Sequence, residues 1–106
     1  AEQIIAVATG AIRDADNGHE LLAAAGRELA IETAILAPNI AARLAYLGVR
    51  SELPSLFGRL AVVDVGGGSI EIAVGENEAS LFDCSLPLGV RRLMSMQTRS
   101  TGCCSA

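Results

Sequence analysis

The segment from Asp64 to Glu71 reads Asp-Val-Gly-Gly-Gly-Ser-Ile-Glu and lies between two apolar runs. The run before it, residues 60–63, is wholly apolar. After it, branched aliphatic residues alternate with other residue types over positions 70–74. Such patterning predicts a strand, a turn and a second strand. We therefore expect a β-hairpin whose turn contains three successive glycines.

The composition of this turn favours a phosphate site. Glycine can take positive φ values and lets the backbone approach a ligand, and successive N–H groups can form an anion-binding concavity. Two glycines would be enough for a plain tight turn. Asp64 and Glu71 on either side suit a phosphate that is accompanied by Mg²⁺, a cation that takes oxygen ligands. The predicted phosphate-binding residues of the turn are Gly66, Gly67, Gly68 and Ser69.

Two common nucleotide-binding motifs do not fit the glycine block. No Lys-Ser or Lys-Thr pair follows it at the spacing of a P-loop. Glu71 stands where the third glycine or alanine of a dinucleotide fingerprint belongs, and the block leads into a predicted strand instead of a helix.

Composition narrows the classes of partner. The chain has 106 residues, one domain or less, and a formal net charge of −4. No basic tract is present, which argues against nucleic-acid binding, and no run of 18 apolar residues could cross a membrane. Three cysteines make no disulfide framework, so we expect free thiols and a cytoplasmic protein. Because the chain lacks an initiator Met, we expect it to begin within a longer protein.

Hydrophobic periodicity predicts alternating strands and helices, and hence an α/β or α+β layer fold. We expect strands over residues 4–8, 32–36 and 80–84 besides the hairpin. One helix is expected after a capping box of Asn17 and Glu20. Another should begin at Pro38 and end at Gly48. Residues 94–106 have no period and little apolar content, which predicts a disordered tail.

Four blocks of sequence together resemble one enzyme family. They occur in the same order and spacing at residues 7–15, 42–49, 62–71 and 85–89. Over residues 4–93 the chain resembles the exopolyphosphatase / guanosine pentaphosphate phosphohydrolase (Ppx/GppA) family of the actin-like ATPase superfamily. The glycine block alone is shared across that superfamily, whereas the four blocks together are specific to the phosphatases.

The resemblance implies a ribonuclease-H-like α/β lobe and a Mg²⁺-dependent hydrolase. Its substrates would be polyphosphate or guanosine pentaphosphate, cleaved at terminal phosphoanhydride bonds. Asp64 would hold Mg²⁺ or its waters, Glu71 would be a second acid in that network, and the glycine turn would cradle phosphate. Arg13 would contact substrate phosphate.

The chain departs from the family pattern in two ways. Family members carry acidic residues before the Ala-Arg-Leu block, one of which is taken as the base that activates water. Here Ile40 and Ala41 stand at these positions, and Asn39 can orient water but cannot take its proton. The family's upstream phosphate loop and most of its second lobe are also absent. We thus predict that residues 1–93 are a partial N-terminal lobe running into the start of the second, with weak or no activity and no assigned catalytic residue.

The sequence leaves two other interpretations of function open. The chain could be a noncatalytic phosphate-binding or structural remnant of the family, or a fragment of an actin-like kinase or chaperone ATPase. The blocks at residues 9–13 and 86–89 speak against the second reading. Because an incomplete lobe leaves sheet edges unpaired, we also expect the chain to need a partner or to self-associate.

Overall fold

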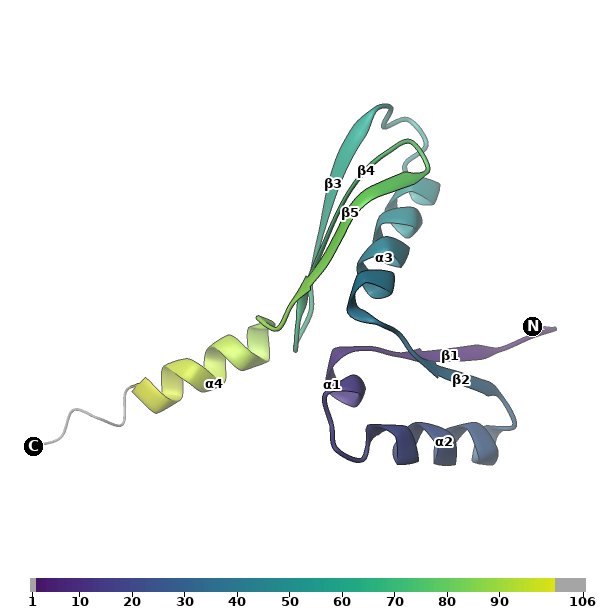
Figure 1. Cartoon of the computed structure of the whole chain (residues 1–106), viewed down its shortest axis with the longest axis vertical. Coiled ribbons are helices and arrows are strands. Elements are labelled where there is room, and N and C mark those ends of the chain that lie inside the picture. Colours follow the sequence, from purple (N-terminus) through teal and green to yellow (C-terminus); the bar gives the residue numbers. More distant parts are fainter. Residues whose placement is uncertain (1, 101–106) are drawn as a thin grey trace, which may run out of the picture.

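The computed structural model describes residues 2–100, with side chains described for residues 2–96. It is a mixed α/β structure, as the sequence predicts, in which helix α3 leads from a two-stranded sheet to a three-stranded one (Figure 1). Its elements are β1 (Ile5–Ala8), α1 (Gly10–Arg13), α2 (Gly18–Leu29), β2 (Glu32–Ile35), α3 (Pro38–Glu52), β3 (Arg59–Val65), β4 (Ile70–Glu76), β5 (Ala79–Leu86) and α4 (Val90–Ser100).

The first sheet pairs β1 and β2 in parallel, from Ile5 opposite Glu32 to Ala8 opposite Ile35. Parallel neighbours need a crossover connection, which α1 and α2 supply (Figure 1). Helix α2 begins directly after Asn17, but the Asn17 side chain makes no capping hydrogen bond. The helix start is therefore confirmed, and the predicted capping box is wrong.

The second sheet contains the predicted glycine hairpin. Strands β3 and β4 pair antiparallel, with Asp64 opposite Glu71 and Val65 opposite Ile70, so the glycines form the connection between them. Strand β5 pairs antiparallel with β4 and is longer than predicted, since it runs to Leu86. The glycine block thus lies at one end of the three-stranded sheet.

Helix α3 packs on one face of this sheet through a small core. Ala42 and Tyr46 of the helix are fully buried, against Val62 of β3 and Ala73 of β4. The Tyr46 hydroxyl donates a 2.7 Å hydrogen bond to the carbonyl oxygen of Asn77, which lies between β4 and β5. These contacts fix the helix to the sheet that carries the glycine turn.

Helix α3 starts at Pro38 as predicted, but its predicted end at Gly48 is wrong. The helix continues to Glu52. Arg50 in the added turn donates hydrogen bonds to the carbonyl oxygens of Leu56, Gly58 and Asn77. Those carbonyls lie in loops beyond the helix, and their attachment to Arg50 outweighs the local preference of glycine for a helix end.

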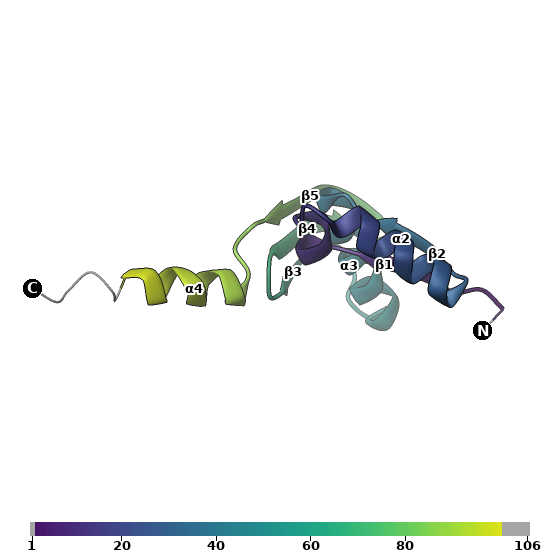
Figure 2. The same ribbon diagram turned by 90° about the horizontal axis from the view of Figure 1, so that it is seen from below.

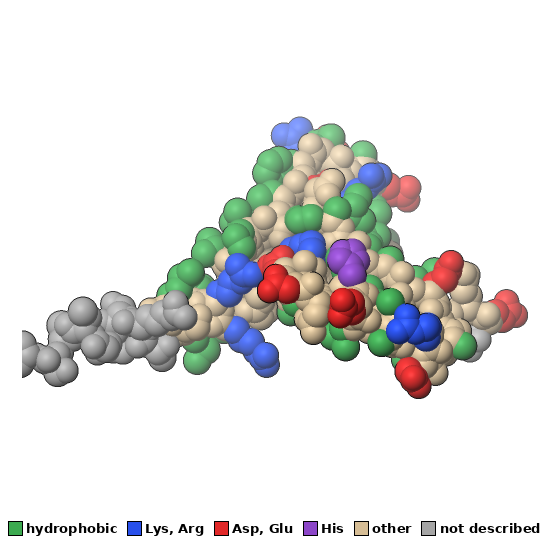
Figure 3. All heavy atoms as spheres, turned by 60° about the horizontal axis from the view of Figure 1, so that its bottom comes forward, with side chains coloured by type: hydrophobic (Ala, Val, Ile, Leu, Met, Phe, Trp, Pro, Cys, Tyr) green, Lys and Arg blue, Asp and Glu red, His purple; other side chains and the backbone are tan. Residues whose placement is uncertain are grey.

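The other face of the three-stranded sheet is apolar and exposed. In the antiparallel registers the side chains on this face are Ala61, Val63, Val65, Ile70, Ile72, Val74, Phe82, Cys84 and Leu86. Val63 keeps 58% of its surface and Phe82 keeps 54%, and Figure 3 shows hydrophobic side chains along the margin of the sheet. The radius of gyration, 17.4 Å, exceeds the value of about 13 Å for a compact chain of this length. Self-association stays a prediction, and this face is the surface that would drive it.

Helix α4 extends away from both sheets (Figures 1 and 2). It runs to Ser100, so residues 94–100 are helical where the sequence predicts disorder. Residues 90–100 contain no glycine or proline to break a helix. The remainder of the predicted tail, residues 101–106, lies outside the described residues. Of the helices within residues 2–100, none has the length and apolar character needed to cross a bilayer.

Candidate functional site

Three segments that are distant in sequence meet at one cavity of about 700 Å³. The turn between β1 and α1 forms one side, the glycine turn forms another, and the start of α4 forms a third. The lining residues are Thr9, Gly10, Ala11, Asp14, Ala15, Asp64, Gly66, Gly67, Gly68, Ser69, Glu71, Arg91, Arg92 and Ser95. All the turn residues and both acids that the sequence singles out therefore lie at one site.

The glycine turn is closed by its own backbone. The Gly66 N–H donates a 2.9 Å hydrogen bond to the carbonyl oxygen of Ser69. Within residues 2–100, the N–H groups of Gly67 and Gly68 donate to no other residue, so these two donors are available to a ligand. None of the three glycines lies in the left-handed region. This turn therefore does not use the freedom of glycine to take positive φ.

The start of α4 requires glycine at position 89. The N–H groups of Val90 and Arg91 donate to the carbonyl oxygens of Gly66 and Gly67 at 3.0 and 2.9 Å. Gly89 is buried against the turn so closely that a Cβ on it would overlap the peptide that follows Gly67. Close approach of two backbones is what Gly89 supplies here, whereas a Cβ at Gly67 or Gly68 would meet only ordinary contacts.

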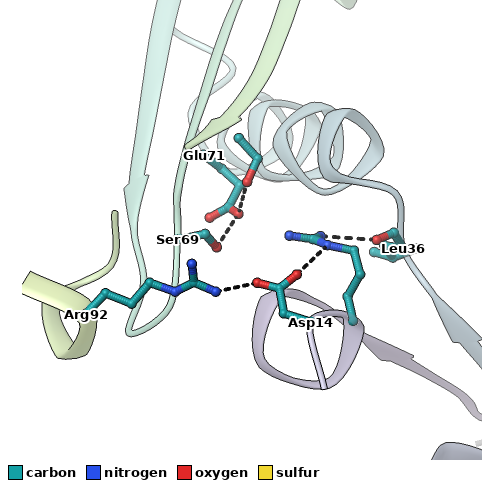
Figure 4. Close-up of polar contacts among 7 residues, drawn as sticks. Asp14, Leu36, Ser69, Glu71 and Arg92 are labelled. Atoms are coloured by element: carbon teal, nitrogen blue, oxygen red, sulfur yellow. Dashed lines mark hydrogen bonds and ion pairs between the residues drawn. The ribbon is translucent and has the colours of Figure 1, made fainter. Parts of the chain in front are cut away.

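The two predicted metal ligands lie opposite each other on one face of the hairpin. Asp64 is exposed, whereas Glu71 is only 8% exposed. The hydroxyls of Ser69 and Ser85 donate to one Glu71 carboxylate oxygen, Oε1, at 2.6 and 2.9 Å (Figure 4). Like charges directly opposite in a sheet are destabilising, and a cation between them would remove that cost.

The donor set fits Mg²⁺ held together with phosphate. Mg²⁺ is usually bound by one or two carboxylates, substrate phosphates and waters, and Asp64 and Glu71 can supply two carboxylates beside the glycine turn. It does not fit a cage made of protein alone. Within residues 2–100, no three His, Cys, Asp or Glu side chains are grouped closely enough to hold a metal ion.

Arg13 lies beside the cavity and is not one of its lining residues. Its NH1 group donates to the carbonyl oxygen of Leu36 at 3.3 Å, and its Nε lies 3.5 Å from Oδ1 of Asp14. The side chain is 20% exposed. A direct contact of Arg13 with substrate stays a prediction, and its NH1 and Nε groups already have partners within the chain.

Two arginines near the start of α4 also line the cavity. Arg91 and Arg92 both do so, and NH2 of Arg92 lies 2.5 Å from Oδ2 of Asp14 (Figure 4). The basic side chains on this side of the molecule lie among acidic ones (Figure 3). The clue in the sequence was their position two and three residues after Gly89, just beyond the family-like block at residues 85–89.

The positions that replace the family's base carry no acid in the structure either. The first turn of α3 has no acidic residue, and neither Ile40 nor Ala41 lines the cavity.

A second cavity, of about 460 Å³, lies at the other end of α3. Its lining is largely apolar, and its arginine, Arg50, already binds three backbone carbonyls, so it is a poor phosphate site.

Comparison with known proteins places the chain in a family. The model of the Ppx/GppA phosphatase family matches residues 1–103. The chain belongs to the Ppx/GppA phosphatase family. The resemblance inferred from the four sequence blocks is thus confirmed.

Individual relatives agree with this assignment. Exopolyphosphatase 1 of Mycobacterium tuberculosis is 37% identical over 91 residues, which cover 86% of this chain and 26% of the relative. A solved PPX-GPPA enzyme of Aquifex aeolicus is 38% identical with a TM-score of 0.75, covering 91% of this chain and 32% of that one. An exopolyphosphatase structure from Cytophaga hutchinsonii is 28% identical with a TM-score of 0.78, covering 87% and 30%. This Ppx/GppA chain spans about a quarter to a third of the relatives it matches.

Proposed function

We propose that this chain is the phosphate- and Mg²⁺-binding segment of an exopolyphosphatase-like hydrolase that acts on polyphosphate or guanosine pentaphosphate. One observation carries the proposal. The N–H groups of Gly67 and Gly68, which have no partner within residues 2–100, line the same cavity as Asp64 and Glu71. The cavity therefore brings N–H groups that can bind a phosphate next to carboxylates that can bind the cation accompanying it. Family membership favours the phosphatase over the kinase or chaperone ATPase that the sequence left open.

The residues of the site have separable tasks in this proposal. The glycine N–H groups bind phosphate oxygens, and Asp64 and Glu71 hold Mg²⁺, which neutralises phosphate charge when bound. The two serine hydroxyls on Glu71 fix the orientation of its carboxylate. Phosphoryl transfer depends largely on positioning and charge neutralisation, and the site supplies both.

We expect the purified chain to show very slow phosphate release from polyphosphate with Mg²⁺. No acid stands in the first turn of α3 to activate water, and loss of a general base costs about 10²- to 10⁴-fold in rate. A colorimetric phosphate assay, with a full-length family member as positive control, measures this. Robust turnover by this chain would contradict the prediction.

We expect pyrophosphate to bind in a Mg²⁺-dependent way and Asp64→Asn to weaken that binding. Outer-shell partners of a metal are worth about 10- to 100-fold in affinity, so loss of a ligand should cost at least about tenfold. Isothermal titration calorimetry with and without Mg²⁺ gives the affinities. Asp16→Asn is the matched control, because Asp16 is exposed and does not line the cavity.

The same titration tests the noncatalytic alternative, which the missing acid in α3 favours. Binding without phosphate release would identify a phosphate-binding module. No detectable pyrophosphate binding by the folded chain would refute the proposed function and leave a structural remnant.

A further inference from the structure

Asp14 lies between two arginines at the cavity. Its Oδ1 is 3.5 Å from Nε of Arg13, and its Oδ2 is 2.5 Å from NH2 of Arg92. Each carboxylate oxygen therefore contacts a different guanidinium group. Figure 4 shows the Arg92 side chain reaching from α4 to Asp14 at the end of α1. The Asp14–Arg92 pair joins segments 78 residues apart in the sequence.

This carboxylate occupies the position that a phosphate oxygen would take on Arg92. Guanidinium groups bind carboxylate and phosphate through the same N–H donors. Asp14 and Arg92 both line the cavity that contains the glycine turn. A phosphate chain could extend from the glycine turn across the cavity to Arg92. There it would find the NH2 group of Arg92 already bound to Asp14, and the negative charge of Asp14 would repel it.

The contact is weak enough to be exchanged. Both side chains are 41% exposed, and ion pairs in such positions contribute little because water screens them. A polyphosphate carries more charge than one carboxylate and can form bidentate contacts with arginine.

We propose that Asp14 is an internal competitor of the phosphate ligand, holding Arg92 until a polyphosphate displaces it. The contact thereby sets the affinity of the site and selects for anions long enough to span from the glycine turn to Arg92. This inference rests on the proposed function, since it concerns regulation of the same site.

The test compares tripolyphosphate binding, with Mg²⁺ present, across a set of variants by calorimetry. Asp14→Asn should bind about fivefold more tightly, the gain expected from releasing an exposed ion pair. Asp16→Asn removes the same charge two residues away without touching Arg92, and should bind within about twofold of the unmodified chain. In Asp14→Asn/Arg92→Gln the gain should be lost, because Arg92, the arginine that lines the cavity and that Asp14 holds, is no longer present to be released.

Each outcome decides a different question. If the unmodified chain binds and Asp14→Asn binds equally or less well, the competitor is refuted while the proposed function stands. A gain that persists in the double variant also refutes it, since the gain is then a general charge effect. No binding by any folded variant overturns the proposed function and the competitor together. Asp14→Ser, which also removes the carboxylate, must reproduce the gain of Asp14→Asn, and circular dichroism confirms that each variant is folded.

Discussion

Gly89→Ala is expected to displace the glycine turn and to weaken pyrophosphate binding at least about tenfold, which corresponds to about 1.4 kcal/mol. The new Cβ would overlap the peptide between Gly67 and Gly68. The glycine turn and the start of α4 cannot move apart without breaking the hydrogen bonds that the Val90 and Arg91 N–H groups donate to the turn. Inserting a methyl group into such a contact typically costs about 1–3 kcal/mol. The change reaches the phosphate donors without removing any of them.

Two readouts separate this effect from general unfolding. Amide NMR shifts of the glycine turn report its displacement directly, and calorimetry reports binding. Gly48→Ala is the matched control, since nothing lies within 4 Å of a Cβ at that position in the middle of α3. It should leave binding unchanged and stabilise the helix by about 0.5–1 kcal/mol. Unchanged turn shifts and full affinity in Gly89→Ala would show that the turn tolerates the methyl group.

Local pattern predicted the hairpin and the residues of its turn that line the cavity. Apolar alternation on both sides of the glycine block leads to a register in which Asp64 faces Glu71, because a hairpin connection fixes which residues are opposite. Pro38 marked the start of α3, since proline is suited to the first helical turn. These features depend on neighbours within a few residues, which a sequence displays directly.

Features that depend on distant partners could not be predicted in this way. The end of α3 is set by Arg50 binding carbonyls in later loops, which overrides Gly48. The contact that Arg92 makes at the cavity is with Asp14, 78 residues earlier. Neither contact can be inferred from hydrophobic periodicity, which reports only on residues within one segment. The same limit applies to Gly89, because its need for glycine comes from contact with the peptide between Gly67 and Gly68.

Gly75→Ala is expected to destabilise the chain by about 3 kcal/mol, the upper part of the usual range for overpacking. A Cβ at Gly75 would lie 2.5 Å from Cζ of Tyr46 and 2.5 Å from the carbonyl oxygen of Ala79. Tyr46 is the largest fully buried side chain of the described residues, and the core around it is small. If the ring moves, its hydrogen bond to Asn77 is lost as well. The carbonyl of Ala79 cannot withdraw, because β5 is held in register on β4.

Urea denaturation followed by circular dichroism measures the loss of stability as a lower urea concentration at the midpoint of unfolding. Gly48→Ala again serves as the control and should raise the midpoint. In a Tyr46→Leu background, Gly75→Ala should still lower the midpoint, but by less, because the overlap with Ala79 persists after the ring is removed. No further loss in that background would place all of the strain on the ring, whereas an unchanged midpoint in Gly75→Ala alone would mean that α3 does not pack on the sheet through Tyr46. Helix α3 leads from one sheet to the other and packs on the sheet that carries the glycine turn. Loss of the packing of Tyr46 on that sheet should therefore also weaken pyrophosphate binding, although Gly75 does not line the cavity.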